Sequence, residues 1–335
     1  MSGNYLSIRE HWLALNPEEA LEPALPIIDA HHHFYDRPGW TYLEPQFRAD
    51  ASSGHFIQAT VYMQALTHYR NGGAEHLKPV GETEYVAAVT EASGAVPKVA
   101  SGIVAYADLR RGKKVREVLE AHAVAGRGRF RGIRHLVTWD ADASLTNPLT
   151  VAPPGMLADK SYRAGLQELE RGGLSYDAWL LWPQLSELVA VADALPDLPI
   201  ILNHCGGIAR IGAYAHRQDE VFTSWSRAVR ILAQRPNVCV KLGGLGMRMN
   251  GFDFDKGILP PTSLQLAEVW RPWMLACIDA FGPERCMFES NFPVDKGSYS
   301  YSNGWNAFKR LTRDFSAQER NELFHGTAAR VYRLT

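Results

Sequence analysis

The sequence has few cysteines, almost no net charge and no long apolar run, and each shortage excludes a class of protein. Its four cysteines form no CxxC pair, so we expect buried, reduced thiols and no disulfide framework. The formal net charge of −1 predicts no general attraction to nucleic acid or anionic membranes. No stretch approaches the roughly 18 apolar residues of a membrane span. Arg9 and Glu10 also interrupt the region where a signal peptide needs its apolar segment. We therefore expect a cytoplasmic protein that acts on a small molecule, with no nucleic-acid or membrane partner and with homo-oligomerisation left open.

The sequence does contain a regular alternation of short β-rich runs and longer helical stretches, which is typical of βα units around a parallel sheet. Eight strands are predicted, at Pro26–His31, Ile57–Gln64, Val99–Ala105, Phe130–Val137, Tyr176–Leu181, Pro199–Asn203, Val238–Leu242 and Arg285–Ser290. The clearest predicted helices are Glu82–Ser93, Val115–Ala125, Leu185–Leu195, Phe222–Ala233, Leu264–Phe281 and a broken closing pair over Ser316–Tyr332. The prediction is an α/β fold, a (β/α)₈ TIM barrel, in one domain over residues 1–335, with a doubly wound sheet as the alternative. Residues 1–25 form an N-terminal extension, and residues 138–160 a long loop over the barrel mouth.

Histidines end two of the predicted strands. In the segment PIIDAHHHF, the side chains of His31 and His33 alternate with that of His32 and so share one face of the first strand. Two imidazoles there can ligate one divalent metal or polarise a substrate carbonyl, or they can simply make hydrogen bonds. In ILNHCGG, the sixth strand delivers His204 at its end, beside two glycines that permit a tight turn. We therefore take His31, His33 and His204 as catalytic and metal-ligand candidates.

Charged and aromatic residues at other strand ends complete the candidate site. Glu289, Asn291 and Asp295, at and after the eighth strand, are catalytic candidates as metal ligands or general base, although Asp295 could also pair with Lys296 in solvent. Of the adjacent Arg134 and His135, only one can point fully inward, Arg134 as a carboxylate clamp or His135 as a proton-transfer group. The remaining substrate-binding candidates are Lys241, Trp40, Tyr62 and Trp139.

Taken together, these motifs resemble the amidohydrolase superfamily. The segments that carry the resemblance are IIDAHHHF, GIRH, ILNHCGG, VKLGGLG, MFESNFPVD and GTAARVYRL. They are similar to the amidohydrolase-related (amidohydrolase-2) group of TIM-barrel metal-dependent hydrolases, which includes sugar and pyrone-dicarboxylate lactonases. The resemblance covers nearly the whole chain and implies a TIM barrel with His31, His33 and His204 at its centre.

The chain departs from this family pattern at two places. The family's eighth-strand aspartate, a metal ligand and general base, is replaced by Asn291, whose amide cannot take a proton from water. Either Glu289, Asp295 or His135 supplies that function, or the chemistry differs. The carbamylated lysine of two-metal relatives has no counterpart on the fourth strand. We therefore expect one divalent metal, Zn²⁺ or Mn²⁺, or none.

The function that this pattern favours is hydrolysis of a lactone or similar cyclic ester of a small acidic, sugar-derived or aromatic substrate. Amide or imide hydrolysis proceeds through the same kind of tetrahedral intermediate and stays open, as does metal-dependent nonoxidative decarboxylation of an aromatic acid. A barrel that binds a ligand without turnover is the non-enzymatic alternative, because Asn291 removes the expected base.

Overall fold

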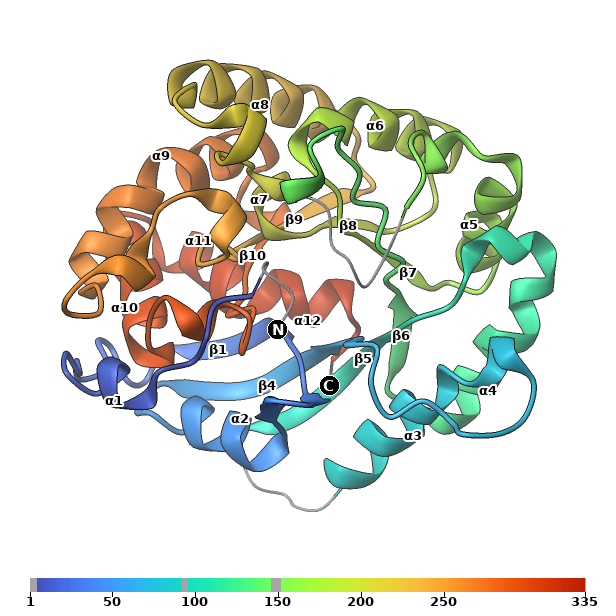
Figure 1. The fold of residues 1–335 in the computed structure, drawn as a ribbon, viewed down its shortest axis with the longest axis horizontal. Coiled ribbons are helices and arrows are strands. Elements are labelled where there is room, and N and C mark those ends of the chain that lie inside the picture. The colour runs from blue at the N-terminus through green and yellow to red at the C-terminus, as the bar shows by residue number, and fades with distance from the viewer. Residues whose placement is uncertain (1–4, 92–95, 146–151, 335) are drawn as a thin grey trace.

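A single sheet of eight parallel strands organises the protein (Figure 1). The computed structural model describes residues 5–91, 96–145 and 152–334. The sheet runs in the order β1-β4-β5-β6-β7-β8-β9-β10, and each neighbouring pair is parallel. The strands are β1 (Pro26–His32), β4 (Phe56–Met63), β5 (Lys98–Ala105), β6 (Phe130–Ile133), β7 (Ser175–Ala178), β8 (Ile200–Leu202), β9 (Val238–Leu242) and β10 (Cys286–Phe288). All eight predicted strands are present, in the predicted order.

The first strand and the chain after the last strand meet and bring the sheet close to closure. An isolated parallel bridge joins His32 to Phe292, and the backbone N–H of Asn291 donates to the carbonyl of His31 at 2.9 Å. Helices surround the ring of strands (Figure 1). This arrangement confirms the predicted (β/α)₈ barrel, and the doubly wound sheet is wrong.

Helices follow most strands, and five of the α-helices were not predicted. The α-helices are α1 (Glu10–Leu13), α2 (Glu44–Ala51), α3 (Val80–Val89), α4 (Arg116–Ala125), α5 (Lys160–Arg171), α6 (Leu185–Ala194), α7 (His204–Gly207), α8 (Gln218–Ala233), α9 (Ser263–Phe281), α10 (Tyr301–Leu311), α11 (Ala317–Asn321) and α12 (Thr327–Val331). The unpredicted helices are the short α1, α2 and α7 and the longer α5 and α10. The short hairpin of β2 (Tyr35–Arg37) and β3 (Trp40–Tyr42) was not predicted either. The predicted break in the closing helix is a π-helical turn, Glu322–Gly326.

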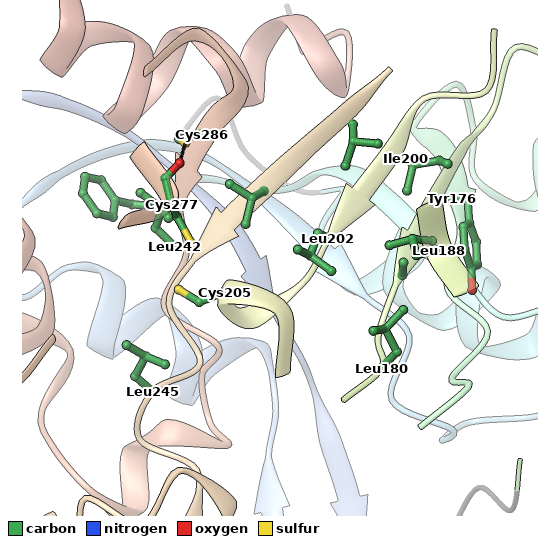
Figure 2. Close-up of a cluster of buried hydrophobic side chains, with 14 of the residues drawn as sticks. Tyr176, Leu180, Leu188, Ile200, Leu202, Cys205, Leu242, Leu245, Cys277 and Cys286 are labelled. Carbon is green, nitrogen blue, oxygen red and sulfur yellow. Dashed lines mark hydrogen bonds between the residues drawn. The ribbon is translucent and has the colours of Figure 1, made fainter. Parts of the chain in front are cut away.

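The main hydrophobic core lies between the sheet and the helices. Figure 2 shows part of it, where Cys205, Cys277 and Cys286 pack near Leu242 and Leu245. These three cysteines are buried, and Cys239 is partly exposed. Buried thiols in apolar surroundings are poorly ionised and therefore unreactive. The structure thus agrees with the expectation of structural thiols.

A smaller apolar cluster fills the barrel interior. Ile28, Val61 and Met287 of the strands pack there against Ala328 and Tyr332 near the C-terminus. Tyr332 is fully buried, and its hydroxyl donates to Asp177 of β7 at 2.8 Å. The C-terminal segment therefore plugs one end of the barrel and leaves the opposite end, at the carboxyl ends of the strands, for a cavity. None of the described helices combines the length and apolar character needed to cross a membrane.

Candidate functional site

A cavity of about 860 Å³, partly open to solvent, lies over the carboxyl ends of the strands. Its polar lining includes His33, Arg134, His204 and Asn291, which follow β1, β6, β8 and β10. The described part of the 138–160 loop adds Thr138, Ser144 and Leu145, and residues 146–151 lie outside the described residues. TIM-barrel enzymes place their active sites at this end. The cavity is therefore the candidate active site.

His31 and His33 lie side by side, as their spacing predicted. Their Nε2 atoms are 3.1 Å apart, and the Nδ1 atom of His33 contacts the carbonyl of Met63 at 2.9 Å. His33 lines the cavity, whereas His31 lies beneath it and is fully buried. Burial lowers the pKa of both imidazoles well below 6.5, so both rings are neutral at pH 7. The intervening His32 points away, stacks on Phe47 and contacts Thr60 Oγ1 at 2.8 Å.

His204 projects from a strained turn directly after β8. Its φ angle is +54°, in the left-handed region that non-glycine residues rarely adopt. The ring has room because residue 244 is glycine, where a Cβ atom would come within 2.4 Å of His204 Nδ1. His204 lies close to His31, with ring centroids 4.5 Å apart. The three histidines therefore converge, although they are distant in sequence.

Glu289 links two of these histidines from below. Its Oε1 lies 2.6 Å from His204 Nδ1, and its Oε2 lies 2.9 Å from His31 Nδ1. Gly243 leaves space for this side chain, because a Cβ atom there would meet Glu289 Cγ at 2.4 Å. Burial raises the pKa of Glu289 to about 8, and the nearby Lys241 and Arg134 oppose that rise. Glu289 does not line the cavity, and its side chain contacts the imidazoles of His31 and His204.

A buried ion pair forms the floor below the histidines. Lys241 Nζ lies 2.9 Å from Asp177 Oδ1 and 3.3 Å from His31 Nδ1, and both charged side chains are fully buried. This placement corrects the expectation that Lys241 binds substrate, since its ammonium group is engaged below the cavity. Asp177 was not among the predicted site residues. It could have been selected for the same reason as Lys241, because charged residues are rarely buried in a strand without a partner.

Asn291 and Asp295 form a pair at the cavity wall. The Asn291 amide Nδ2 donates to Asp295 Oδ1 at 2.9 Å, which turns the amide oxygen away from that carboxylate. Asp295 Oδ2 accepts from the Tyr299 hydroxyl at 2.7 Å and from the Gly246 N–H at 2.9 Å. Asp295 is fully buried and is not a solvated partner of Lys296, whose ammonium pairs with Asp50. Asn291 lines the cavity, whereas Asp295 does not line it and orients the Asn291 amide through their hydrogen bond.

The Asp295 carboxyl is expected to make stability depend on pH. Burial raises its pKa from 3.8 to about 7. Between pH 3.8 and about 7, Asp295 is therefore ionised in the unfolded chain but still protonated in the folded protein. Stability therefore falls as pH rises through that window, by up to about 1.4 kcal/mol per pH unit from this group. Asp295→Asn should remove this slope. Urea unfolding of both proteins at several pH values measures it, and parallel stability curves would contradict the assignment.

Arg134 and His135 point in opposite directions, as neighbours after a strand must. Arg134 lines the cavity, and its Nη2 lies 3.4 Å from His204 Nε2. His135 faces the other way, where its Nδ1 accepts from the Leu109 N–H at 3.2 Å. The structure therefore places Arg134 in the site and corrects the expectation that His135 takes part in catalysis.

The aromatic candidates lie outside the cavity. Tyr62 points into the core and donates to Glu82 at 2.7 Å, because it alternates with the inward-facing Met63. Trp40 stacks on Tyr35 from the outer side, with ring centroids 4.4 Å apart. Trp139 does not line the cavity, and its backbone N–H donates to Gln184. The aromatic lining instead consists of Tyr5, Tyr35 and Trp179, which no periodic pattern marked.

The histidine cluster fits a divalent cation. One ligand atom each from His31, His204 and Glu289 lie within 4.8 Å of one another. However, the 2.6 Å contact between Glu289 and His204 is a hydrogen-bond distance, shorter than the ~3.3 Å between two ligands of one tetrahedral zinc ion. The 3.1 Å between the Nε2 atoms of His31 and His33 is closer to that value. The geometry therefore favours imidazole ligands, with Glu289 as their outer partner.

Comparisons with known proteins agree with this architecture. A family model described as amidohydrolase matches residues 28–334. An uncharacterised protein of Sinorhizobium fredii, y4mH, is 37% identical over 294 residues, which cover 88% of this chain and 86% of that protein. An L-fucono-1,5-lactonase of Burkholderia multivorans is 27% identical over 317 residues, covering 92% of this chain and 96% of the relative.

Solved structures show the same fold. A crystal structure of an amidohydrolase from Burkholderia multivorans with bound HEPES has a TM-score of 0.72 and 26% identity, and covers 92% of this chain and 99% of its own. A second crystal structure of an amidohydrolase from that organism, with bound zinc, has a TM-score of 0.70, the same identity and the same coverage. The family match over residues 28–334 includes His31, His33 and His204.

Proposed function

Because the chain belongs to the amidohydrolase family and is a hydrolase of that type, we propose that it opens the ring of a lactone. The observation that carries the proposal is the convergence of His33, His204 and Arg134 on one cavity. The similarity to an L-fucono-1,5-lactonase over nearly the full chain supports it. Lactone opening needs a polarised carbonyl and an activated water, and this cluster provides groups for both.

In this proposal, His204 accepts the proton of the attacking water. Arg134 can only donate, so its 3.4 Å contact with His204 Nε2 requires that nitrogen to be an acceptor. Burial, reinforced by the Arg134 charge, lowers the pKa of His204 well below 6.5, which keeps the ring neutral at pH 7. A neutral ring whose Nε2 carries no proton can act as a general base at the cavity. Asn291 presents its amide oxygen as a hydrogen-bond acceptor for water or substrate.

His31 and His33 are the proposed metal ligands. His204, also a ligand candidate in the sequence, is left out of the proposed ligand set, because its Nδ1 contacts Glu289 and its Nε2 serves as the base. A divalent cation such as Zn²⁺ or Mn²⁺ supplies Lewis-acid polarisation of the carbonyl when it is bound. The bound zinc in the related amidohydrolase supports this assignment. The neutral state of these rings at pH 7 also suits them to bind a cation, because a protonated imidazole has no free lone pair.

The cavity also favours a substrate with an acidic group. Three arginines, Arg37, Arg134 and Arg248, line it, and none of the described lining residues is acidic. Arg134 is buried deepest, beside the histidines, and its planar guanidinium suits a carboxylate. We therefore assign Arg134 to an acidic substituent of the lactone, next to the carbonyl that reacts.

A substrate panel tests the proposal. Purified enzyme, with and without added Zn²⁺, is assayed with a pH indicator against acidic, sugar and aromatic lactones and against amides, and CO₂ release is followed with aromatic acids. We expect acid formation from lactones, fastest for one that carries a carboxylate. Turnover of amides or release of CO₂, with no lactone opened, would overturn the assignment.

A further inference from the structure

The hydrogen bonds around His33 determine which of its nitrogens carries the proton. A backbone carbonyl can only accept, so the 2.9 Å contact with Met63 requires a proton on His33 Nδ1. A neutral imidazole has one N–H, so His33 Nε2 is an acceptor. The 3.1 Å contact between His33 Nε2 and His31 Nε2 then requires the proton to sit on His31 Nε2.

The other side of His31 agrees with this assignment. With its proton on Nε2, His31 Nδ1 is an acceptor, and Lys241 Nζ donates to it at 3.3 Å. Glu289 Oε2 also lies 2.9 Å from His31 Nδ1 but receives no hydrogen bond of good geometry within the described part of the chain. When Glu289 is ionised, a fully buried carboxylate oxygen therefore faces a nitrogen that has no proton to give it, whereas a protonated Glu289 donates to that nitrogen. Such an orphaned acceptor is costly unless another state of the site uses it.

We propose that Glu289 is a positioning residue that allows His31 to exchange the proton on its Nε2 for a divalent cation. A cation held by His31 Nε2 takes the place of that proton, and the ring stays neutral only if Nδ1 gains one. The new Nδ1–H then faces Glu289 Oε2, which is already 2.9 Å away. The ring holds one proton in both states, so with ionised Glu289 the change is a tautomeric exchange of the ring. With protonated Glu289, the carboxyl gives its proton to Nδ1 and the proton from Nε2 leaves to solvent. The inference rests on the proposed metal ligands and not on the lactone reaction.

The floor of the site can accommodate the exchange. When His31 Nδ1 becomes a donor, the N–H of Lys241 that pointed at it loses its acceptor. Asp177 Oδ2 has no hydrogen-bond partner among the described residues, and its other oxygen already accepts from Lys241 at 2.9 Å. The freed N–H can turn toward it. Glu289 Oε2 and Asp177 Oδ2, which both lack a hydrogen-bond partner in the described portion of the cation-free protein, therefore each gain one in the cation-bound protein.

The first measurement is the tautomer of His31 in the intact protein. Nitrogen-15 NMR of the imidazoles, with the His31 signals assigned by a His31→Gln variant, distinguishes a protonated from an unprotonated ring nitrogen. We expect the proton on Nε2 without metal and on Nδ1 after addition of Zn²⁺. The same tautomer in both states, or no Zn²⁺ binding at all, would overturn the inference without touching the lactone proposal.

The second measurement compares Zn²⁺ affinities by chelator competition. Glu289→Gln keeps the shape of the side chain but cannot accept from both histidines, and loss of an outer partner of a metal ligand typically weakens binding about 10–100-fold. The matched control is Glu82→Gln, which alters another fully buried carboxylate that receives a hydrogen bond from Tyr62. It should bind Zn²⁺ as the wild type does. Equal affinities for wild type and Glu289→Gln, or equal losses in both variants, would contradict the proposal.

Discussion

Replacing His204 with asparagine is expected to lower the kcat for lactone opening by about 10²–10⁴-fold, the usual contribution of general acid–base catalysis. Of the three histidines, His33 and His204 line the cavity, and only His204 has its Nε2 within 3.4 Å of the proposed substrate clamp, Arg134. Asparagine places an amide near the position of Nδ1, so the contact with Glu289 can survive while the Nε2 atom is lost. The KM should change little, because Arg134 still binds the substrate.

His135→Asn provides the matched control for this experiment. His135 was an equally good catalytic candidate in the sequence, but its ring packs near Tyr106 and Tyr162, with centroids 5.2 and 5.3 Å away. An asparagine there can still accept the hydrogen bond from the Leu109 N–H, which now ends on His135 Nδ1. Steady-state kinetics of both variants should show a large loss for His204→Asn and near wild-type turnover for His135→Asn. Comparable losses in both would mean that the base is not His204.

The barrel could be predicted from the sequence because its strands carry a strong local signal. Parallel strands covered on both faces are rich in apolar residues, and most of the eight predicted strands were Val/Ile/Leu-rich. The same signal placed several strand ends too late, by the most at β6 and β7, which end at Ile133 and Ala178. The buried residues Val137 and Leu181 beyond them are not in strands. At the mouth of a barrel, a residue can be buried without lying in a strand, because loops also pack inward there.

The candidate site was predictable where strand alternation applied and not elsewhere. Alternation placed His31 and His33 on one face, and required that only one of Arg134 and His135 point inward, without saying which one. It could not reveal that Lys241 pairs with Asp177, because that contact joins strands 64 positions apart in sequence. Nor could it show that Tyr5, from the N-terminal extension, lines the cavity. Such contacts depend on closure of the barrel and on loop paths, which leave no local periodicity.

Replacing Arg134 with methionine is expected to lower kcat/KM about 10–100-fold for a lactone that carries a carboxylate. A hydrogen bond to a charged group is worth about 1.5–3 kcal/mol, and each 1.4 kcal/mol corresponds to a factor of ten. A neutral lactone with the same ring should lose far less. Arg134→Lys should recover part of the activity on the acidic lactone, because lysine restores the charge but not the planar fork that binds a carboxylate through two parallel bonds.

The comparison between the acidic and the neutral lactone shows whether Arg134 binds the acidic substituent or the reacting carbonyl. Since Arg134 lies 3.4 Å from His204 Nε2, its guanidinium could also reach the reacting carbonyl. In that case both lactones would lose activity equally, mainly in kcat, and the role of Arg134 as a clamp for an acidic substituent would be wrong. A loss confined to the acidic lactone and expressed mainly in KM supports that role. The buried positive charge of Arg134 also interacts with the carboxylates Asp177 and Glu289, so its loss can lower the stability of the protein. Thermal unfolding of each variant is therefore compared with that of the wild type.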